Sequence, residues 1–252
     1  MKIFQKYALD FDAEQTQYIV FPKSSGVNDT LKSTEDGFTF SVWFKRKADN
    51  NNGSFFSFGE WYATRFRFWN DGRLLCQLGY GSLVEAGYLM KSFNSGVSYN
   101  DGNWHHWVVT WDGHNRVLYS YVDGNVDMDA RVTKLSKHEI WSNLDKIVGA
   151  YSSVGSEPVN AVIGEIRIYD RPLTEEEIQY LYNGGHIEDG LVFWLYPNEE
   201  DVVLDDDGQT VLQVTERING YVGTAYNGVK LVDGKDIDQL QKTKKVLVVK
   251  RV

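Results

Sequence analysis

The chain has 252 residues, of which 42% are hydrophobic and 14% aromatic, enough for one large core or a core with a small appendage, so general disorder is excluded. Its 26 basic and 35 acidic side chains give a formal net charge of -9, the wrong sign for holding a phosphate backbone, so we expect no nucleic-acid partner. Cys76 is the only cysteine, which excludes an internal disulfide, and no apolar run is long enough for a membrane span.

The first half of the chain is dominated by strand patterns. Phe38–Lys45 alternates, with phenylalanine or valine at every second position, as in a half-buried strand. Arg65–Trp69 is followed by Asn70–Gly72 and then by Arg73–Leu78, which predicts a hairpin whose glycine supplies a positive φ. Cys76 lies in the second arm of this hairpin, where we expect a buried, unreactive thiol.

A second hairpin is predicted farther along, with Asp123-Gly124 as its turn between Tyr119–Val122 and Asn125–Met128. The preceding strand contains His105 and His106 side by side. Neighbouring strand positions face opposite sides, so the two histidines do not converge on one metal ion, and we expect one to be inward and hydrogen-bonded and the other exposed.

One short helix is expected at 174–182. Thr174 and Glu177 have the spacing of a capping box, two further glutamates suit the positive end of the helix dipole, and Asn183–Gly185 supplies the stop. The strand before it, Glu165–Tyr169, alternates between isoleucines on one face and charged residues on the other. The sequence therefore predicts an all-β protein, an antiparallel β-sandwich with a single helix.

The last quarter is more polar, and we place a boundary at Gly190. Leu191–Tyr196 is apolar on both faces, which predicts a central strand covered on both sides. The predicted units are a sandwich over 1–189 and a β-rich extension over 190–252, ending in a basic tail at 241–252. The extension consists either of permuted final strands or of an incomplete second unit.

Four blocks together resemble the concanavalin A-like, laminin G-type family. Ala8–Asp12 with Tyr18–Val20 looks like its first strand and Phe38–Phe44 like its second; the other two blocks are Trp104–Gly113 with Tyr121–Gly124, and Gly164–Ile178. The resemblance implies a jelly roll of two curved sheets in a family used for sugar binding, cell adhesion and surface display. The family has catalytic and non-catalytic members, so the fold alone does not decide the function.

Aromatic residues near turns are the candidate glycan-binding residues, because aromatic faces stack on pyranose rings while loops supply hydrogen bonds. The competing interpretation is that these residues fill the core or cover a sheet. The candidates lie around the first hairpin and in the glycine-rich segment after it: Trp61, Tyr62, Trp69, Tyr80 and Tyr88.

No cofactor requirement is expected. Calcium at a rim of the sandwich is compatible with the resemblance, but the available acids lack the spacing of a calcium loop: Asp10, Asp12, Asp170 and Asp205–Gly208. A retaining glycosidase needs two carboxylates about 5 Å apart, and no alternating run of acids supplies them; the nearest case is Asp127-Met-Asp129. We therefore predict no catalytic residue and no metal ligand.

The resulting hypothesis is a non-catalytic module for surface binding or assembly, recognising glycans or cell-surface or particle proteins. Such families work outside cells, and residues 1–8 lack the apolar stretch of a secretory signal, so we expect a virion or another extracellular surface, reached by particle assembly. The alternatives are a glycoside hydrolase of this fold and an adhesion module cut from a longer secreted protein.

The basic tail is the expected assembly element, because its apolar centre has the composition of a strand. An unpaired strand would be an edge hazard, so it should pair with its own sheet or with a neighbouring subunit in a homo-oligomer or capsid. The acidic body would guide such docking. The charged residues of the tail are Lys242, Lys244, Lys245, Lys250 and Arg251.

Overall fold

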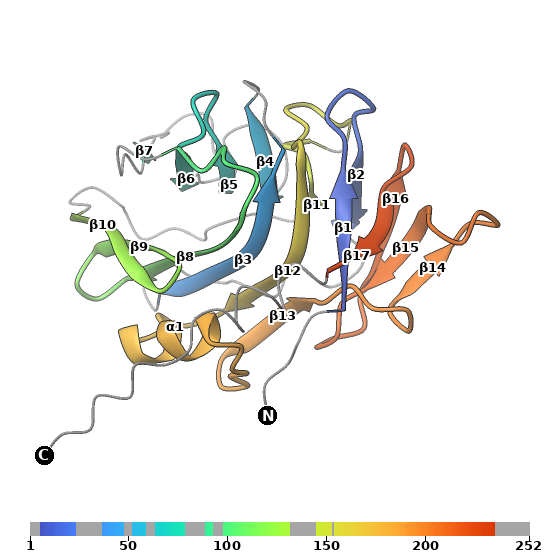
Figure 1. Cartoon of the computed structure of the whole chain (residues 1–252). Helices are drawn as coiled ribbons and strands as arrows, with labels where there is room; N and C mark the ends of the chain where they lie inside the picture. Colours follow the sequence, from blue (N-terminus) through green and yellow to red (C-terminus); the bar gives the residue numbers. More distant parts are fainter. Residues whose placement is uncertain are drawn as a thin grey trace, which may run out of the picture.

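The structure is a computed structural model, and it describes residues 6–23, 37–47, 52–58, 64–78, 89–92, 98–131, 145–152 and 154–234. Two antiparallel sheets form a sandwich (Figure 1), which confirms the predicted fold class. Sheet A contains, in spatial order, β10 (Asn125–Arg131), β9 (Val117–Val122), β8 (Trp104–Asp112), β3 (Phe38–Arg46), β12 (Ala161–Tyr169), β1 (Tyr7–Phe11) and β17 (Lys230–Asp233), while β13 (Leu191–Leu195) also pairs with β12.

Sheet B packs against sheet A through a shared core. Its strands are, in spatial order, β14 (Val202–Leu204), β15 (Val211–Thr215), β16 (Val222–Tyr226), β2 (Tyr18–Phe21), β11 (Lys146–Val148), β4 (Gly53–Phe58), β5 (Arg65–Phe68), β6 (Leu74–Leu78) and β7 (Leu89–Ser92). The predicted hairpin turns join β5 to β6 and β9 to β10. Asp123 and Gly124 both have positive φ, 52° and 76°, as the tight turn between β9 and β10 requires.

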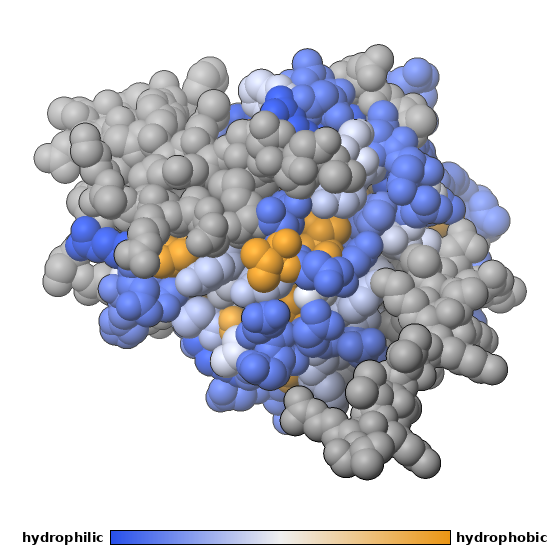
Figure 2. Space-filling model, turned by 60° about the vertical axis from the view of Figure 1, so that its left-hand side comes forward, coloured by the Kyte–Doolittle hydropathy of each residue, from blue (hydrophilic) through white to orange (hydrophobic). Residues whose placement is uncertain are grey.

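Aromatic side chains fill the space between the sheets. The alternating residues of β3 all point inward and are fully buried, as predicted: Phe38, Phe40, Val42 and Phe44. The ring of Phe40 stacks on that of Phe66 from β5 with 3.8 Å between centroids, which joins the two sheets directly. On the face drawn in Figure 2, hydrophilic residues predominate and apolar ones show only in small areas, so most large apolar side chains are withdrawn from water.

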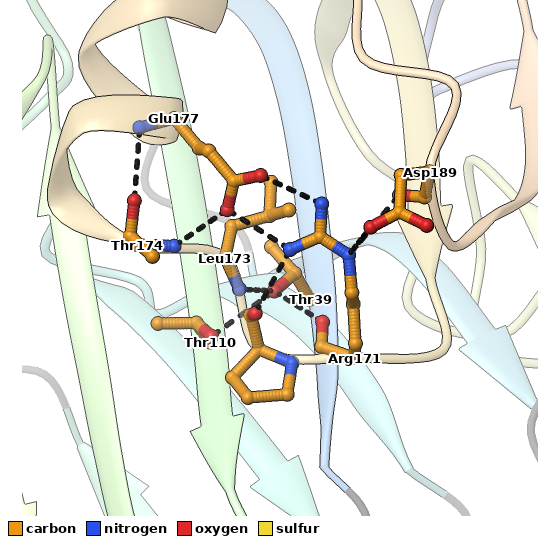
Figure 3. A network of polar contacts seen from close by, with 8 residues as sticks. Thr39, Thr110, Arg171, Leu173, Thr174, Glu177 and Asp189 are labelled. Atoms are coloured by element: carbon orange, nitrogen blue, oxygen red, sulfur yellow. Dashed lines mark hydrogen bonds and ion pairs between the residues drawn. The ribbon is translucent and has the colours of Figure 1, made fainter.

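Part of the outer face of sheet A is covered by α1 (Glu175–Tyr182), the one helix among the described residues. The capping box is confirmed, because the Thr174 hydroxyl accepts from the backbone N–H of Glu177 and the Glu177 carboxylate accepts from that of Thr174. Arg171 binds the same carboxylate with both Nη atoms, at 2.9 and 2.6 Å, and binds Asp189 on its other side (Figure 3). Thr39 of β3 bonds to the backbone on both sides of Pro172 and so attaches this network to the sheet.

The two histidines of β8 face opposite sides, as predicted. His106 is buried against Trp43 and Tyr182, and its Nε2 lies 2.8 Å from the hydroxyl of Ser41. The prediction that the other histidine is exposed was wrong, because the side chain of His105 is only 13% exposed. Its ring nitrogens lie 3.0 Å from Asp123 and 3.2 Å from Asp101, acids that two turns bring to the strand.

Strands from both sides of Gly190 share both sheets. β13 pairs with β12, β16 with β2, and β17 with β1. β13 is covered on both faces, as predicted, with Phe193 in the core between the sheets and Trp194 in the cluster beneath α1. The predicted central position was wrong, because among the described residues β13 pairs with β12 alone. Among the described residues, no helix has the length and the apolar character that a membrane crossing requires.

We expect the two histidines to titrate differently. Burial, and then the charge of Arg167, lowers the pKa of His106 to about 3. Burial alone would lower the pKa of His105, but Asp123 and Asp101 outweigh it and raise that pKa above 6.5. By proton NMR, the chemical shift of the hydrogen on Cε1 of His106 should stay constant from about pH 8 to 5. The corresponding shift of His105 should titrate with a midpoint above 6.5.

The raised pKa of His105 also predicts a pH-dependent contribution to stability. That contribution is complete below about pH 6.5, where both the folded and the unfolded chain hold the proton, and it disappears as pH rises through the folded-state pKa. His105→Gln should therefore cost more free energy of unfolding at about pH 5.5 than at about pH 8.5. An equal loss at both pH values would contradict the ion pairs with Asp101 and Asp123.

Candidate functional site

Of the five aromatic residues predicted to bind glycans, Trp69 is the one that lies among the described residues. Trp69 lies at the turn between β5 and β6 and is half-buried. In chain order, Trp61 and Tyr62 lie between β4 and β5, and Tyr80 and Tyr88 lie between β6 and β7. These four residues, like the whole tail from 235 to 252, lie outside the described residues, so those predictions stay predictions.

The outer face of sheet B carries two arginines on β5. Phe66 and Phe68 point into the core, so strand alternation turns Arg65 and Arg67 to the opposite face. The strand register places Gln77 of β6 directly beside Arg65. The sequence pattern identified these arginines only as strand residues, although arginines that alternate with phenylalanines are themselves a signal for two guanidinium groups on one face.

Both arginines bind Glu157, which lies in the loop between β11 and β12. The Nη1 atoms of Arg65 and Arg67 lie 2.8 and 2.9 Å from Oε2 of Glu157, and Nε of Arg65 donates to Oε1 of Gln77 at 2.8 Å. We call these four residues the arginine cluster. Burial, and then the charge of Arg65, lowers the pKa of Arg67 to about 10, so Arg67 remains charged at neutral pH.

Aromatic rings lie at both ends of the arginine cluster. The ring centroid of Tyr151 is 4.3 Å from the guanidinium carbon of Arg65, and that of Trp69 is 5.3 Å from that of Arg67. These are cation–π distances, and the rings help to hold the guanidinium groups in place. On the outer face of β5, two half-buried aromatic rings thus flank the guanidinium groups of Arg65 and Arg67, and Glu157 beside them is one third exposed.

The loop that holds Glu157 has an unfavourable backbone conformation. Glu157 itself has φ 47°, a left-handed conformation that costs a glutamate about 1 to 2 kcal/mol. Its carbonyl accepts from Ser54 of β4 at 3.2 Å, and the carbonyl of Ser156 accepts from the N–H of Tyr151 at 2.7 Å. Strain that surrounding contacts maintain in this way is common at binding sites, so Glu157 is a candidate functional residue that sequence analysis missed.

A second aromatic surface lies on the same face of sheet B. Tyr18 of β2 and Tyr226 of β16 stack with 4.9 Å between ring centroids and 14° between their planes. Tyr226 is 42% exposed, while Tyr18 is buried beside Gly155 of the same loop. The pair offers an exposed ring whose orientation is fixed by its neighbour.

Two of the acids considered for calcium form ion pairs in the structure. Asp10 forms an ion pair with Lys47 at 2.5 Å, and Asp207 forms one with Lys230 at 2.7 Å. In the described part of the chain, no group of three or more His, Cys, Asp or Glu side chains could hold a metal ion. Cys76 is fully buried, and burial raises the pKa of its thiol, which confirms the predicted unreactive cysteine.

The laminin G-type model of the Concanavalin A-like lectin/glucanases superfamily matches residues 13–179, more than half of the 252 residues. The chain belongs to this superfamily. The resemblance drawn from the four sequence blocks is therefore confirmed, and the arginine cluster lies on a sheet of a concanavalin A-like sandwich. The comparison with curated protein sequences gave no match.

Solved structures with the concanavalin A-like fold resemble the chain at low identity. A Bacteroides ovatus protein, provisionally assigned as carbohydrate binding, has 16% identity and a TM-score of 0.62 over 92% of this chain; the match covers 60% of that protein. A heptameric SAP-like pentraxin from Limulus polyphemus has 14% identity and a TM-score of 0.53, with 91% of this chain and 95% of that chain covered. The NanB sialidase from Streptococcus pneumoniae has 13% identity and a TM-score of 0.56, with 85% of this chain and 34% of that chain covered. Likenesses at such identities show the fold alone.

A side chain at Gly149, where the loop to Glu157 begins, should lower the free energy of unfolding. Its φ is +87°, and a Cβ there would lie 2.4 Å from the buried ring of Phe11. Gly220 is the matched control, because it has φ +72° but nothing within 4 Å of the added atom. Gly220→Ala should lower the free energy of unfolding by about 1 kcal/mol, and Gly149→Ala by about 1 to 3 kcal/mol more. Urea unfolding measures both, and equal losses would contradict the close contact with Phe11.

Proposed function

We propose that the protein is a non-catalytic glycan-binding module and that the outer face of sheet B at the arginine cluster is its binding site. The observation that carries this proposal is the arrangement of Tyr151, Arg65, Arg67 and Trp69, in which flat rings flank fixed hydrogen-bonding groups. A sugar ring has the complementary chemistry, with an apolar face of C–H groups and an edge of hydroxyl groups.

The strands pre-organise this site. Arg65 and Arg67 are two positions apart on one strand, and both are bound to Glu157, so little side-chain freedom remains to be lost when a ligand binds. Guanidinium N–H groups donate to hydroxyl oxygens, and the Glu157 carboxylate, one third exposed, accepts from hydroxyl groups. The likeness to the Bacteroides ovatus protein supports a carbohydrate ligand for this fold, though this chain spans only 60% of that protein's length.

A hydrolase is the alternative, since the fold also supports enzymes. Retaining hydrolysis needs a second carboxylate about 5 Å from the first. Within the described residues, the ionisable groups in ion-pair contact with Glu157 are both arginines. This environment favours a binding role for Glu157 over a catalytic one.

The assembly part of the proposal concerns the surface on which the module works. We predict that the module works on a virion or another extracellular particle and attaches through the basic tail at 241–252. This stays a prediction, because the tail lies outside the described residues. Deleting 241–252 and measuring mass by light scattering tests this part independently of glycan binding.

Trp69→Ala should weaken glycan retention at least about tenfold, equivalent to about 1.4 kcal/mol of binding free energy, and leave the fold intact. Affinity electrophoresis against a polysaccharide panel measures the loss. Tyr180→Ala is the control, because Tyr180 is a half-exposed aromatic residue on α1, over the other sheet. If Trp69→Ala instead lowers the free energy of unfolding by about 3 to 5 kcal/mol, Trp69 is a core residue.

The same panel separates binding from hydrolysis. We expect retention without release of reducing ends during prolonged incubation. Sustained release that Glu157→Gln abolishes would replace the binding module with a glycoside hydrolase.

A further inference from the structure

We infer that the glycan bound at the arginine cluster is acidic and carries a carboxylate that the two guanidinium groups receive. This inference rests on the proposed function and specifies its ligand class. The cluster contains two cationic side chains and one anionic one, so it has a local surplus of one positive charge on a chain whose net charge is -9. A neutral sugar would leave that surplus uncompensated.

The hydrogen bonds within the cluster leave donors available. Arg65 uses Nε for Gln77 and Nη1 for Glu157, while Arg67 uses Nη1 for Glu157 and Nε for the carbonyl of Phe68 at 3.4 Å. In the described part of the chain, Nη2 of neither arginine has an acceptor. Two further N–H-bearing nitrogens therefore remain for a ligand.

Burial makes these donors selective for charge. The side chains of Arg65 and Arg67 are only 11% and 3% exposed, so their charges are poorly solvated by water. A charge interacts more strongly in such surroundings, and a carboxylate matches the planar fork of a guanidinium group better than a hydroxyl does. A guanidinium group that is poorly solvated, and whose Nη2 has no acceptor among the described residues, therefore favours an anion as its ligand.

Glu157 is the internal competitor for the same guanidinium groups. Its Oε2 accepts from both arginines, and the loop holds it there at the cost of a left-handed backbone. A ligand carboxylate would add to the cluster beside Glu157, close enough to be repelled by it. Removing the charge of Glu157 should therefore strengthen the binding of an acidic glycan, whereas removing a guanidinium should weaken it.

The test compares matched polysaccharides that differ only in charge. Alginate, pectic galacturonan, hyaluronan and a sialylated glycoprotein are each immobilised together with a carboxyl-reduced counterpart. We expect the full chain to retain at least one carboxylated member about tenfold more strongly than its reduced counterpart, with a preference that decreases as salt is raised.

Substitutions assign the preference to this site. Arg65→Gln should abolish it, Arg65→Lys should keep part of it, and Glu157→Gln should increase it several-fold. Arg217→Gln is the matched control, because Arg217 also pairs with acids, Glu200 and Asp201, and lies by aromatic rings elsewhere on the molecule. Thermal unfolding of each variant verifies that it is folded; if Arg65→Gln is not, the opposite response of Glu157→Gln decides alone.

The outcomes separate the two proposals. Equal retention of carboxylated and reduced members, or a Glu157→Gln variant that binds the acidic member less tightly, would overturn the acidic ligand and leave the glycan-binding module intact. Retention of neither member of any pair would overturn the proposed function itself, and the acidic ligand with it.

Discussion

The stacked rings of Phe40 and Phe66 connect the two sheets, and the orientation of the candidate site depends on this contact. Their centroids are 3.8 Å apart in a core from which water is excluded. With Phe66 held inward, the alternation of β5 sends Arg65 and Arg67 outward. A register shift of one residue would move two guanidinium groups into the apolar core and two phenylalanines to the outer face, a change that costs far more than any contact on the outer face provides.

The loop between β11 and β12 completes the site at an energetic cost. Gly149 allows the chain to turn where a Cβ would meet Phe11, and Glu157 adopts a left-handed conformation. The ion pairs of Glu157 with Arg65 and Arg67 are partly buried, so they are less screened than surface pairs and offset a strain of about 1 to 2 kcal/mol. The same contacts that hold the loop therefore fix the carboxylate.

Features coded by neighbouring residues were predictable from the sequence. The inward face of Phe38–Phe44 follows from a period of two, and the helix start follows from Thr174 and Glu177. Features made by distant segments were not predictable. His105 was expected to be exposed because a strand pattern does not show the acids that turns bring to it, and Glu157 was missed because its loop meets β5 only in the folded chain.

The two outer faces each hold a buried arginine beside a tryptophan, and the two arginines differ in their hydrogen bonds, with Arg67 3% and Arg167 4% exposed. Beneath α1, Arg167 lies 5.3 Å from the ring of Trp194, the distance that also separates Arg67 from Trp69. All three nitrogens of Arg167 have acceptors, because Nε and Nη2 donate to Glu165 and Nη1 donates to the carbonyl of Gly185. The segment after α1 thus helps to complete on sheet A a hydrogen-bonding pattern that the described residues leave incomplete on sheet B. With the same residue types and similar burial in both places, the Nη2 atoms of Arg65 and Arg67, which have no acceptor among the described residues, are the feature that favours a bound partner on sheet B over a purely structural ion pair.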